Sequence, residues 1–396
     1  VLEYIIITSN YWLYLMEVSM DKKIGILTFQ ASHNNGSLLQ AYALQKVISE
    51  KMGYQNKIIN FSNKNSQDMY ALFPRSSSLK RVIKNLFYLT FYKKVKTHFD
   101  DFNRFINSEL KLSDGFFETS KDLEKIADNY DILVSGSDQI WNINCYDADD
   151  AYFLNFTNNV KKVAYAPSLG ANNILEHADD VDKYRNYLMD YSALSIREKN
   201  GKKWIEELTG REVELTLDPT MLLKRDEWDD ITLSKLYDKE YIFYYAFHYS
   251  DEVNRAVKKI SEKLNIPVIV LDAKSWAIRR LFSMGFELTE HGGPSVMLSM
   301  IKNASLVFTT SYHGTIFSTV FEKPFWFVKS TMLNKGDDRA YTLLEQTGLE
   351  ERFMDVNKLE EVDLFKPIDY NKVNKKVEKL RESSLEYLKN ALENDK

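Results

Sequence analysis

Apolar runs of strand length alternate with amphipathic stretches from residue 24 onward. Residues 24–29 are largely apolar, and residues 32–37 that follow are rich in turn-forming side chains. Residues 38–51 carry apolar side chains at helical spacing, and residues 57–61 again have the pattern of a strand. This order predicts a βαβ unit, and strands that are apolar on both faces predict a buried parallel sheet.

The strand pattern recurs in both halves of the chain. In the first half, further strands are predicted at residues 130–136, 162–166 and 193–197. A second set is predicted at residues 241–245, 266–271, 304–309 and 324–328. Helical stretches lie between these strands, so both halves are α/β.

Two facing Rossmann-like domains and a terminal helix are the predicted architecture. Residues 20–230 form the N-terminal domain and residues 231–370 the C-terminal domain, with a seam near residues 221–238. Residues 371–396 carry one apolar stripe on a charged amphipathic helix. Ligands of doubly wound sheets bind at the carboxyl ends of the strands, so the site is expected between the domains.

Residues 1–19 do not fit this pattern. Their apolar run is interrupted by Ser9 and Asn10, and it lacks the basic leader of a signal peptide and the length of a membrane span. Met20 stands just before the first strand. We expect residues 1–19 to be a disordered extension that comes from upstream translation.

Residues 80–96 also stand apart, because they combine six basic side chains with many aromatic and aliphatic ones and contain no acid. One interpretation is a helix that contacts an anionic membrane or a lipid-linked acceptor. The commoner use of such a pattern is a surface helix that packs its aromatic face on the domain.

Composition narrows the classes of function. Hydrophobic residues make up 44% of the chain and charged residues 28%, as in globular proteins. The net charge of −5 provides no general attraction to nucleic acid. A single cysteine, Cys145, excludes an internal disulfide and a cysteine-based metal site, and it fits the cytoplasm. Aromatic residues reach 13%, and such side chains line carbohydrate sites or fill cores.

Several strong signatures are missing from the sequence. It contains no dinucleotide fingerprint after a strand, no phosphate loop, no zinc-protease motif and no nucleophile elbow. Residues 147–150 resemble the Asp-x-Asp motif of some glycosyltransferases, but no other ligand is placed beside them. We therefore predict neither a metal nor a cofactor.

The sharpest local feature follows the predicted strand at residues 304–309. Hydroxyl residues are followed by His313 and Gly314, and a helix is expected at residues 316–321. The first N–H groups of a helix and its dipole attract phosphate. His313 can act as an acid, a base or a cationic ligand. The alternative is that the helix is simply capped and that His313 has only a structural role. The position at the end of a buried strand favours function.

The neighbours of His313 extend this candidate phosphate site. Ser311 and Thr315 provide hydroxyl groups, and Gly314 allows a close approach of the backbone.

Other strand ends carry further candidates. Arg197 ends a predicted strand, where its guanidinium can bind a carboxylate or a phosphate. The alternative is a structural salt bridge to Glu198 or to a neighbouring helix. Asp138 follows a strand and can serve as a base or as a helix cap. The remaining candidates lie in turns at the same presumed edge, and they are Asn35, Gly36, Ser37, Gly136 and Ser137.

Taken together, short blocks of the chain resemble the polysaccharide pyruvyl transferase family. The blocks appear in family order and lie at residues 23–28, 35–44, 134–142, 165–170, 195–198, 217–220, 293–294, 310–314 and 339–352. Each block is weak by itself, but the ordered set is specific and covers most of the chain.

The resemblance implies a GT-B-like fold with an N-terminal acceptor side and a C-terminal donor side. It implies transfer of pyruvate from phosphoenolpyruvate to two sugar hydroxyls as a cyclic ketal, in the biosynthesis of exopolysaccharide or an envelope polymer. The donor site would use Arg197 and His313, with Gly293 and Pro294 among the binding residues. Ser311 departs from the pattern, because some members carry arginine there, and the donor site thereby loses one cation.

Two other functions remain open. A nucleotide-sugar glycosyltransferase would use the same helix N-terminus to hold a diphosphate. A non-catalytic sugar-binding protein of the same pathway would bind polysaccharide without releasing phosphate. The expected partners are phosphoenolpyruvate and a sugar acceptor, lipid-linked or nucleotide-linked, in the cytoplasm or at the inner face of the membrane.

Overall fold

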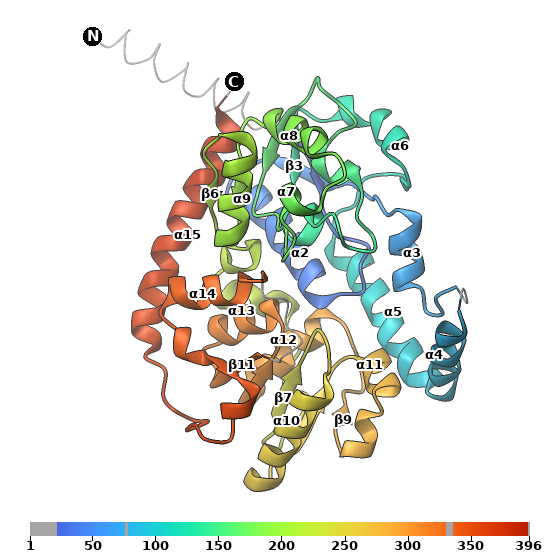
Figure 1. Ribbon diagram of the computed structural model, residues 1–396, viewed down its shortest axis with the longest axis vertical. Helices are drawn as coiled ribbons and strands as arrows, with labels where there is room; N and C mark the ends of the chain where they lie inside the picture. The colour runs from blue at the N-terminus through green and yellow to red at the C-terminus, as the bar shows by residue number, and fades with distance from the viewer. Residues whose placement is uncertain (1–21, 76–77, 330–335, 395–396) are drawn as a thin grey trace.

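The computed structural model describes residues 22–75, 78–329 and 336–394, and the predicted extension at residues 1–19 lies outside them. Within these residues, two parallel sheets are flanked by helices (Figure 1). The first sheet has the order β2-β1-β3-β4, with β1 Lys23–Leu27, β2 Gln55–Ile58, β3 Ile132–Ser135 and β4 Lys161–Ala164. A short pair follows, β5 Ser195–Ile196 and β6 Glu214–Leu215.

The second sheet has the order β12-β11-β10-β7-β8-β9. Its strands are β7 Ile242–Tyr245, β8 Val268–Val270, β9 Glu287–Leu288, β10 Leu306–Thr309, β11 Phe325–Lys329 and β12 Phe353–Asp355. Of the twelve strands in the described residues, nine overlap predicted strands, although β5 is shorter than predicted, and β6, β9 and β12 were missed. The missed strands have two or three residues and are partly exposed, so they carry no continuous apolar run.

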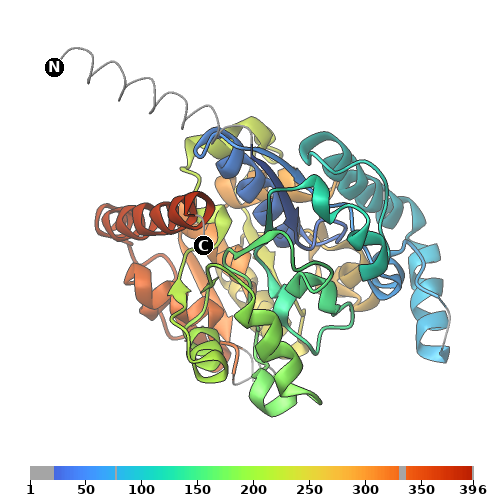
Figure 2. The same ribbon diagram turned by 90° about the horizontal axis from the view of Figure 1, so that it is seen from above.

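Helix α2, Asn35–Glu50, lies near the centre of the molecule in Figure 1, and Figure 2 shows the same fold from above. It begins three residues before the predicted helix, because the Asn34 side chain accepts hydrogen bonds from the N–H groups of Gly36 and Ser37. Nearly all of its residues are buried, and it contacts α12, Pro294–Asn303, of the second half. The first turn of a buried helix, rather than a loop, therefore carries the candidates Asn35, Gly36 and Ser37.

The C-terminal helix α15, Tyr370–Glu393, runs along one side of both halves (Figure 1, red). Near its start, the Tyr370 hydroxyl donates to the Lys323 carbonyl at 2.6 Å in the second half. Further along, Arg381 Nε donates to the Met221 carbonyl at 2.8 Å, and the Tyr387 hydroxyl donates to the Ala164 carbonyl at 2.9 Å. The helix thus links the two halves.

Helices α4, Leu79–Thr90, and α5, Tyr92–Glu109, also cross between the halves. They belong to the first half in sequence, but they contact α11, Ala273–Ile278, and α5 also contacts α12. One continuous hydrophobic cluster includes Ile24 of the first sheet and Val307 of the second. A large apolar interface of this kind holds the halves in a fixed arrangement.

Candidate functional site

Three predicted residues from both halves meet where the strands of the two sheets end, and Asp218 joins them. In the sequence, Arg197 follows β5, Asp138 follows β3 and His313 follows β10, and all three side chains are buried. Arg197 Nη1 donates to Asp218 Oδ2 at 2.6 Å, and its Nη2 donates to Asp138 Oδ1 at 3.0 Å. His313 Nε2 lies 3.5 Å from Asp218 Oδ2. Of the predicted alternatives, the ion pair with Glu198 is wrong, because the guanidinium pairs with the carboxylates of Asp138 and Asp218.

His313 is held against the start of α2. A Cβ atom on Gly36 would lie 2.0 Å from His313 Nδ1, so only glycine leaves room for the ring. The imidazole therefore lies between Asp218 on one nitrogen and the N-terminus of α2 on the other. Two helix N-termini, those of α2 and of α13, Tyr312–Val320, converge at this residue. Convergent helix N-termini favour an anion.

The prediction that the helix begins after Gly314 is wrong. Helix α13 begins at Tyr312 because Ser311 caps it and accepts the Gly314 N–H at 3.4 Å. Gly314 allows close approach to a protein neighbour, since its Cβ would lie 2.1 Å from Thr309 Oγ1. The Thr315 hydroxyl donates to the Ser311 carbonyl at 3.1 Å. All of these contacts shape the helix start that carries His313.

The predicted residues of the first half support the same cluster. Ser137 Oγ donates to the Ala166 carbonyl at 2.7 Å and to Asp218 Oδ2 at 3.1 Å. A Cβ on Gly136 would lie 3.0 Å from the Thr28 side chain, so this turn packs directly on the loop after β1. The Ser37 hydroxyl donates to Asp138 Oδ2 in a short hydrogen bond.

Two further contacts join the halves at this place. Asn35 Nδ2 donates to the Tyr245 hydroxyl at 3.4 Å. The Arg197 guanidinium lies 4.7 Å from the centre of the Tyr312 ring, within the range of a cation–π contact. The predicted site residues thus form much of the seam itself.

Gly293 and Pro294 contact a different part of the molecule. Gly293 precedes α12 with φ of 85°, and its Cβ would lie 3.5 Å from the Asp101 backbone in α5. No contact within the described residues links this turn directly to His313 or Arg197. Their role as binding residues remains a prediction.

The positive charges of the cluster lower the pKa values of its two buried aspartates, Asp138 and Asp218. Burial would raise the pKa of Asp218, but the charges of His313 and Arg197 hold it well below its usual range. Burial would also raise the pKa of Asp138, and Arg197, His313 and the Ser37 hydrogen bond lower it below its usual value. Both aspartates are therefore ionised at neutral pH. A strongly held carboxylate is a weak base, so the geometry favours Asp138 as a positioning residue.

The pKa of Glu198 is raised, in contrast to the lowered pKa values of the two aspartates. Its side chain is fully buried, Oε1 accepts the Leu169 N–H at 2.8 Å, and Oε2 has no partner within the described residues. Burial raises the pKa of Glu198 to about 8, although the charges of Arg197 and Arg339 oppose it. The carboxyl group is therefore largely protonated at neutral pH.

Arg339 is a site residue that the sequence did not single out. It is the first residue of α14, Arg339–Thr347, and two of its nitrogens donate to Asp337 at 2.8 and 2.6 Å. Its positive charge lowers the pKa of Asp138 and opposes the rise in the pKa of Glu198, so it acts electrostatically on the cluster. Arg339 therefore adds a second arginine, beside Arg197, whose charge acts on this cluster.

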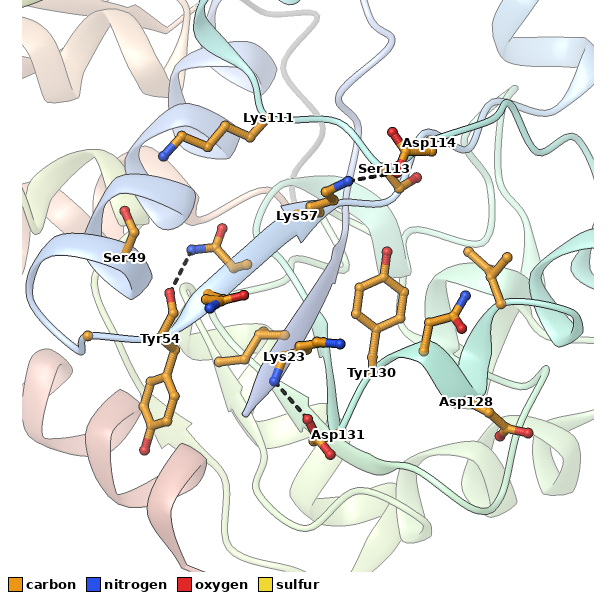
Figure 3. Close-up of a pocket in the computed structure, with 16 residues that line it drawn as sticks. Lys23, Ser49, Tyr54, Lys57, Lys111, Ser113, Asp114, Asp128, Tyr130 and Asp131 are labelled. Atoms are coloured by element: carbon orange, nitrogen blue, oxygen red, sulfur yellow. Dashed lines mark hydrogen bonds and ion pairs between the residues drawn. The ribbon is translucent and has the colours of Figure 1, made fainter. Parts of the chain in front are cut away.

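A large hollow lies at the opposite edge of the first sheet (Figure 3). Its volume is about 1070 Å³, and it is open beside the amino ends of β1, β2 and β3. Lys57 Nζ donates to Asp114 Oδ2 at 2.9 Å, and the Lys23 N–H donates to Asp131 Oδ2 at 2.7 Å (Figure 3). Ligands of parallel sheets bind at the carboxyl ends, so size alone does not make this hollow the site.

The acidic loop at residues 147–150 uses its carboxylates for structure. The Asp149 side chain caps a short helix by accepting the Ala151 N–H, and Asp150 Oδ2 pairs with Lys183 Nζ at 3.0 Å. Burial raises the pKa of Asp147 to about 6. Among the described residues, no group of three metal-ligating side chains comes together, and no helix has the length and apolarity to cross a bilayer.

Solved structures share this fold at low sequence identity. A protein of Listeria monocytogenes described as a UDP-N-acetylglucosamine 2-epimerase aligns with a TM-score of 0.53 at 12% identity, over 90% of each chain. MnaA of S. aureus, solved with UDP, aligns with a TM-score of 0.52 at 12% identity, over 86% of each chain. The molecule thus has a GT-B-like fold of two Rossmann-like halves with its polar cluster at the seam.

The family is settled by sequence. The model of the polysaccharide pyruvyl transferase family matches residues 34–330, so the chain belongs to this family of transferases. No curated protein matches the chain.

Proposed function

We propose that this protein transfers pyruvate from phosphoenolpyruvate to two hydroxyls of a sugar, forming a cyclic ketal and releasing phosphate. The observation that carries the proposal is the position of His313, which lies between the Asp218 carboxylate and the start of α2. This arrangement provides a held acid–base group next to an anion-binding position, and the reaction requires both.

The donor is a trianion that needs several positive partners. We assign its phosphate and carboxylate to the N-termini of α2 and α13 and to the Arg339 guanidinium. Arg197 is held by two buried aspartates, Asp138 and Asp218, whereas Arg339 is held by one carboxylate, that of Asp337. We therefore assign donor binding chiefly to Arg339 and the helix starts, with Arg197 holding the two aspartates in place.

In the proposed reaction, His313 carries out the proton transfers to the donor and from the first hydroxyl. Protonated His313 gives its proton to the methylene carbon of phosphoenolpyruvate, which makes the adjacent carbon electron-poor. A sugar hydroxyl attacks that carbon and returns its proton to His313. The second hydroxyl then displaces phosphate, which carries away the remaining proton as the ketal closes. Asp218 orients the imidazole, and such proton transfer contributes roughly 10²–10⁴-fold in rate.

Phosphate release from phosphoenolpyruvate tests the proposal. The chain is incubated with phosphoenolpyruvate and a panel of galactosides, mannosides, N-acetylmannosaminides and glucuronides. We expect acceptor-dependent phosphate release that His313→Ala reduces by at least about 100-fold. His177→Ala, an exposed histidine on α7, Ile174–His177, is the matched control and should retain full activity.

A nucleotide-sugar glycosyltransferase is the second candidate, because a protein with this fold was solved with UDP. Consumption of a UDP- or GDP-sugar without any use of phosphoenolpyruvate would favour it. Binding of polysaccharide without turnover of either donor would favour a non-catalytic role.

A further inference from the structure

Exposed apolar side chains are concentrated on one short segment. Six of the fifteen large hydrophobic residues exposed in the described part of the chain lie between residues 79 and 92, so this surface differs from the rest. They are Leu79, Val82, Ile83, Leu86, Leu89 and Tyr92, which we call the α4 stripe. Leu79 is 76% exposed and Leu86 57%. Single exposed leucines are normal on a protein surface, but a group of exposed apolar side chains marks an interaction site.

The spacing places the stripe on one face of a helix. Leu79, Ile83, Leu86 and Leu89 follow one another at intervals of four, three and three residues. Helix α4 lies at the periphery of the molecule in Figure 1, and Figure 2 also shows it at an edge. The Tyr92 ring, at the start of α5, stacks on Phe73 at 6.2 Å between centroids, whereas the aliphatic side chains of the stripe are exposed in the described part of the chain.

The opposite face of α4 fixes the helix on the second half. Tyr88 is buried, and Lys274 Nζ lies 5.5 Å from the centre of its ring. The Phe91 ring, at the end of α4, packs edge-on against Trp276 of α11 at 5.1 Å between centroids. The helix is therefore anchored by its aromatic face, as predicted for the commoner interpretation, yet it presents a second apolar face outward.

The exposed charges of the segment itself are all positive, although Arg81 is paired with Asp68 at 2.6 Å. Lys80, Lys84, Lys93 and Lys94 are exposed, and no acidic residue occurs between residues 79 and 99. An isologous contact with a second copy would bring these lysines face to face, which is unfavourable. An exposed apolar stripe edged with lysine matches instead the surface of a bilayer that contains anionic lipid.

We propose that α4 docks the protein on an anionic membrane surface. The α4 stripe enters the boundary between headgroups and acyl chains, and Lys80, Lys84 and Lys93 contact lipid phosphates. The proposal is independent of the sugar chemistry at His313.

Vesicle co-sedimentation of the full chain tests this docking. We expect binding to vesicles of phosphatidylcholine with phosphatidylglycerol, weak binding to phosphatidylcholine alone, and release as salt is raised. The double variant Leu86→Glu/Leu89→Glu should lose binding, and each Lys→Gln change should weaken it roughly five-fold. The matched control is Leu233→Glu/Leu236→Glu, which alters two leucines of similar exposure away from α4 and should bind normally.

Three results would overturn the proposal. Equal binding by the α4 double variant would mean that another segment contacts the lipid. Equal binding to neutral vesicles would remove the role of the lysines. A concentration-dependent dimer that the double variant abolishes, without vesicle binding by the unaltered chain, would show that a second copy covers the stripe. Unchanged melting temperatures of the variants establish that they remain folded.

Discussion

The Arg197 guanidinium compensates two buried carboxylates, and its removal should therefore destabilise the fold. Arg197→Ala leaves Asp138 and Asp218 unpaired, and breaking a buried ion pair in this way costs about 3–5 kcal/mol. Urea unfolding measures the cost. Arg225→Ala removes an arginine from an exposed pair with Glu322 and should cost less than about 1 kcal/mol; an equal loss in both variants would contradict the assignment.

Gly36 and His313 should behave as one unit. Gly36→Ala forces the imidazole to move, because the new Cβ would lie 2.0 Å from Nδ1. We expect turnover to fall at least about 100-fold in Gly36→Ala, and we expect no further fall when the change is made in His313→Ala. A double-mutant cycle of phosphate-release rates tests this coupling. Additive losses would show that Gly36 acts through something other than the ring.

Glu198 should make stability depend on pH. Its usual pKa is 4.5 and its pKa in the folded protein is about 8, so between these values the folded chain holds a proton that the unfolded chain has lost. Stability from this group is complete below pH 4.5 and is lost as pH rises through 8. Glu198→Gln should therefore melt at least about 3 °C above the unaltered chain at pH 9, with a difference that shrinks toward pH 5.

Differential scanning calorimetry at both pH values measures this difference. A Glu198→Gln advantage of the same size at pH 5 and pH 9 would show that the carboxyl group does not titrate in this range. Asp338→Asn is a useful comparison, because the pKa of that half-buried carboxyl is also raised by burial and it accepts the Asn200 N–H.

Sequence reasoning found the site residues that end predicted strands, and it missed those positioned by tertiary contacts. An apolar run of strand length precedes each of His313, Arg197 and Asp138, and this pattern can be recognised in the sequence. Asp218 lies in a recognisable Asp-Pro-Thr block, but nothing local shows that its carboxylate meets both Arg197 and His313. Arg339 is brought to the cluster by the second half's fold.

At the scale of elements, helix α15 contributes to both halves at once. Leu388 is fully buried against the core cluster, whereas Lys389 beside it is exposed. Leu388→Ala should destabilise the protein by about 2–5 kcal/mol, and Lys389→Ala should change stability by less than about 0.5 kcal/mol. Urea unfolding measures both. A cost below about 1 kcal/mol for Leu388→Ala would show that α15 is only loosely attached.

Helix starts were the least predictable feature of the elements. The apolar periodicity of α2 begins at Leu38, but the Asn34 side chain starts the helix at Asn35. In the same way, Ser311 starts α13 at Tyr312. Capping hydrogen bonds extend helices into polar residues that carry no periodic signal, and here those polar residues belong to the candidate site.

At the scale of the whole molecule, the predicted division into two α/β halves describes the sheets but not every helix. The strands of the first sheet lie before residue 165 and those of the second after residue 241. Helices α4, α5 and α15 cross between the halves, and the sequence offers no local signal for such crossing because amphipathic periodicity does not specify a partner. The order of the predicted strands was enough to predict the fold class. The packing of these helices could not be predicted from the sequence.

The most direct test of the central claim is the thermal shift of the full chain with phosphoenolpyruvate, beside UDP- and GDP-sugars and inorganic phosphate. A ligand at about 100 times its dissociation constant adds roughly 2.7 kcal/mol, so the melting temperature should rise by a few degrees. We predict that phosphoenolpyruvate raises it, that Arg339→Met abolishes the rise, and that Arg225→Met leaves it intact. A rise with nucleotide sugars alone, or with phosphoenolpyruvate in Arg339→Met as in the unaltered chain, would contradict the account.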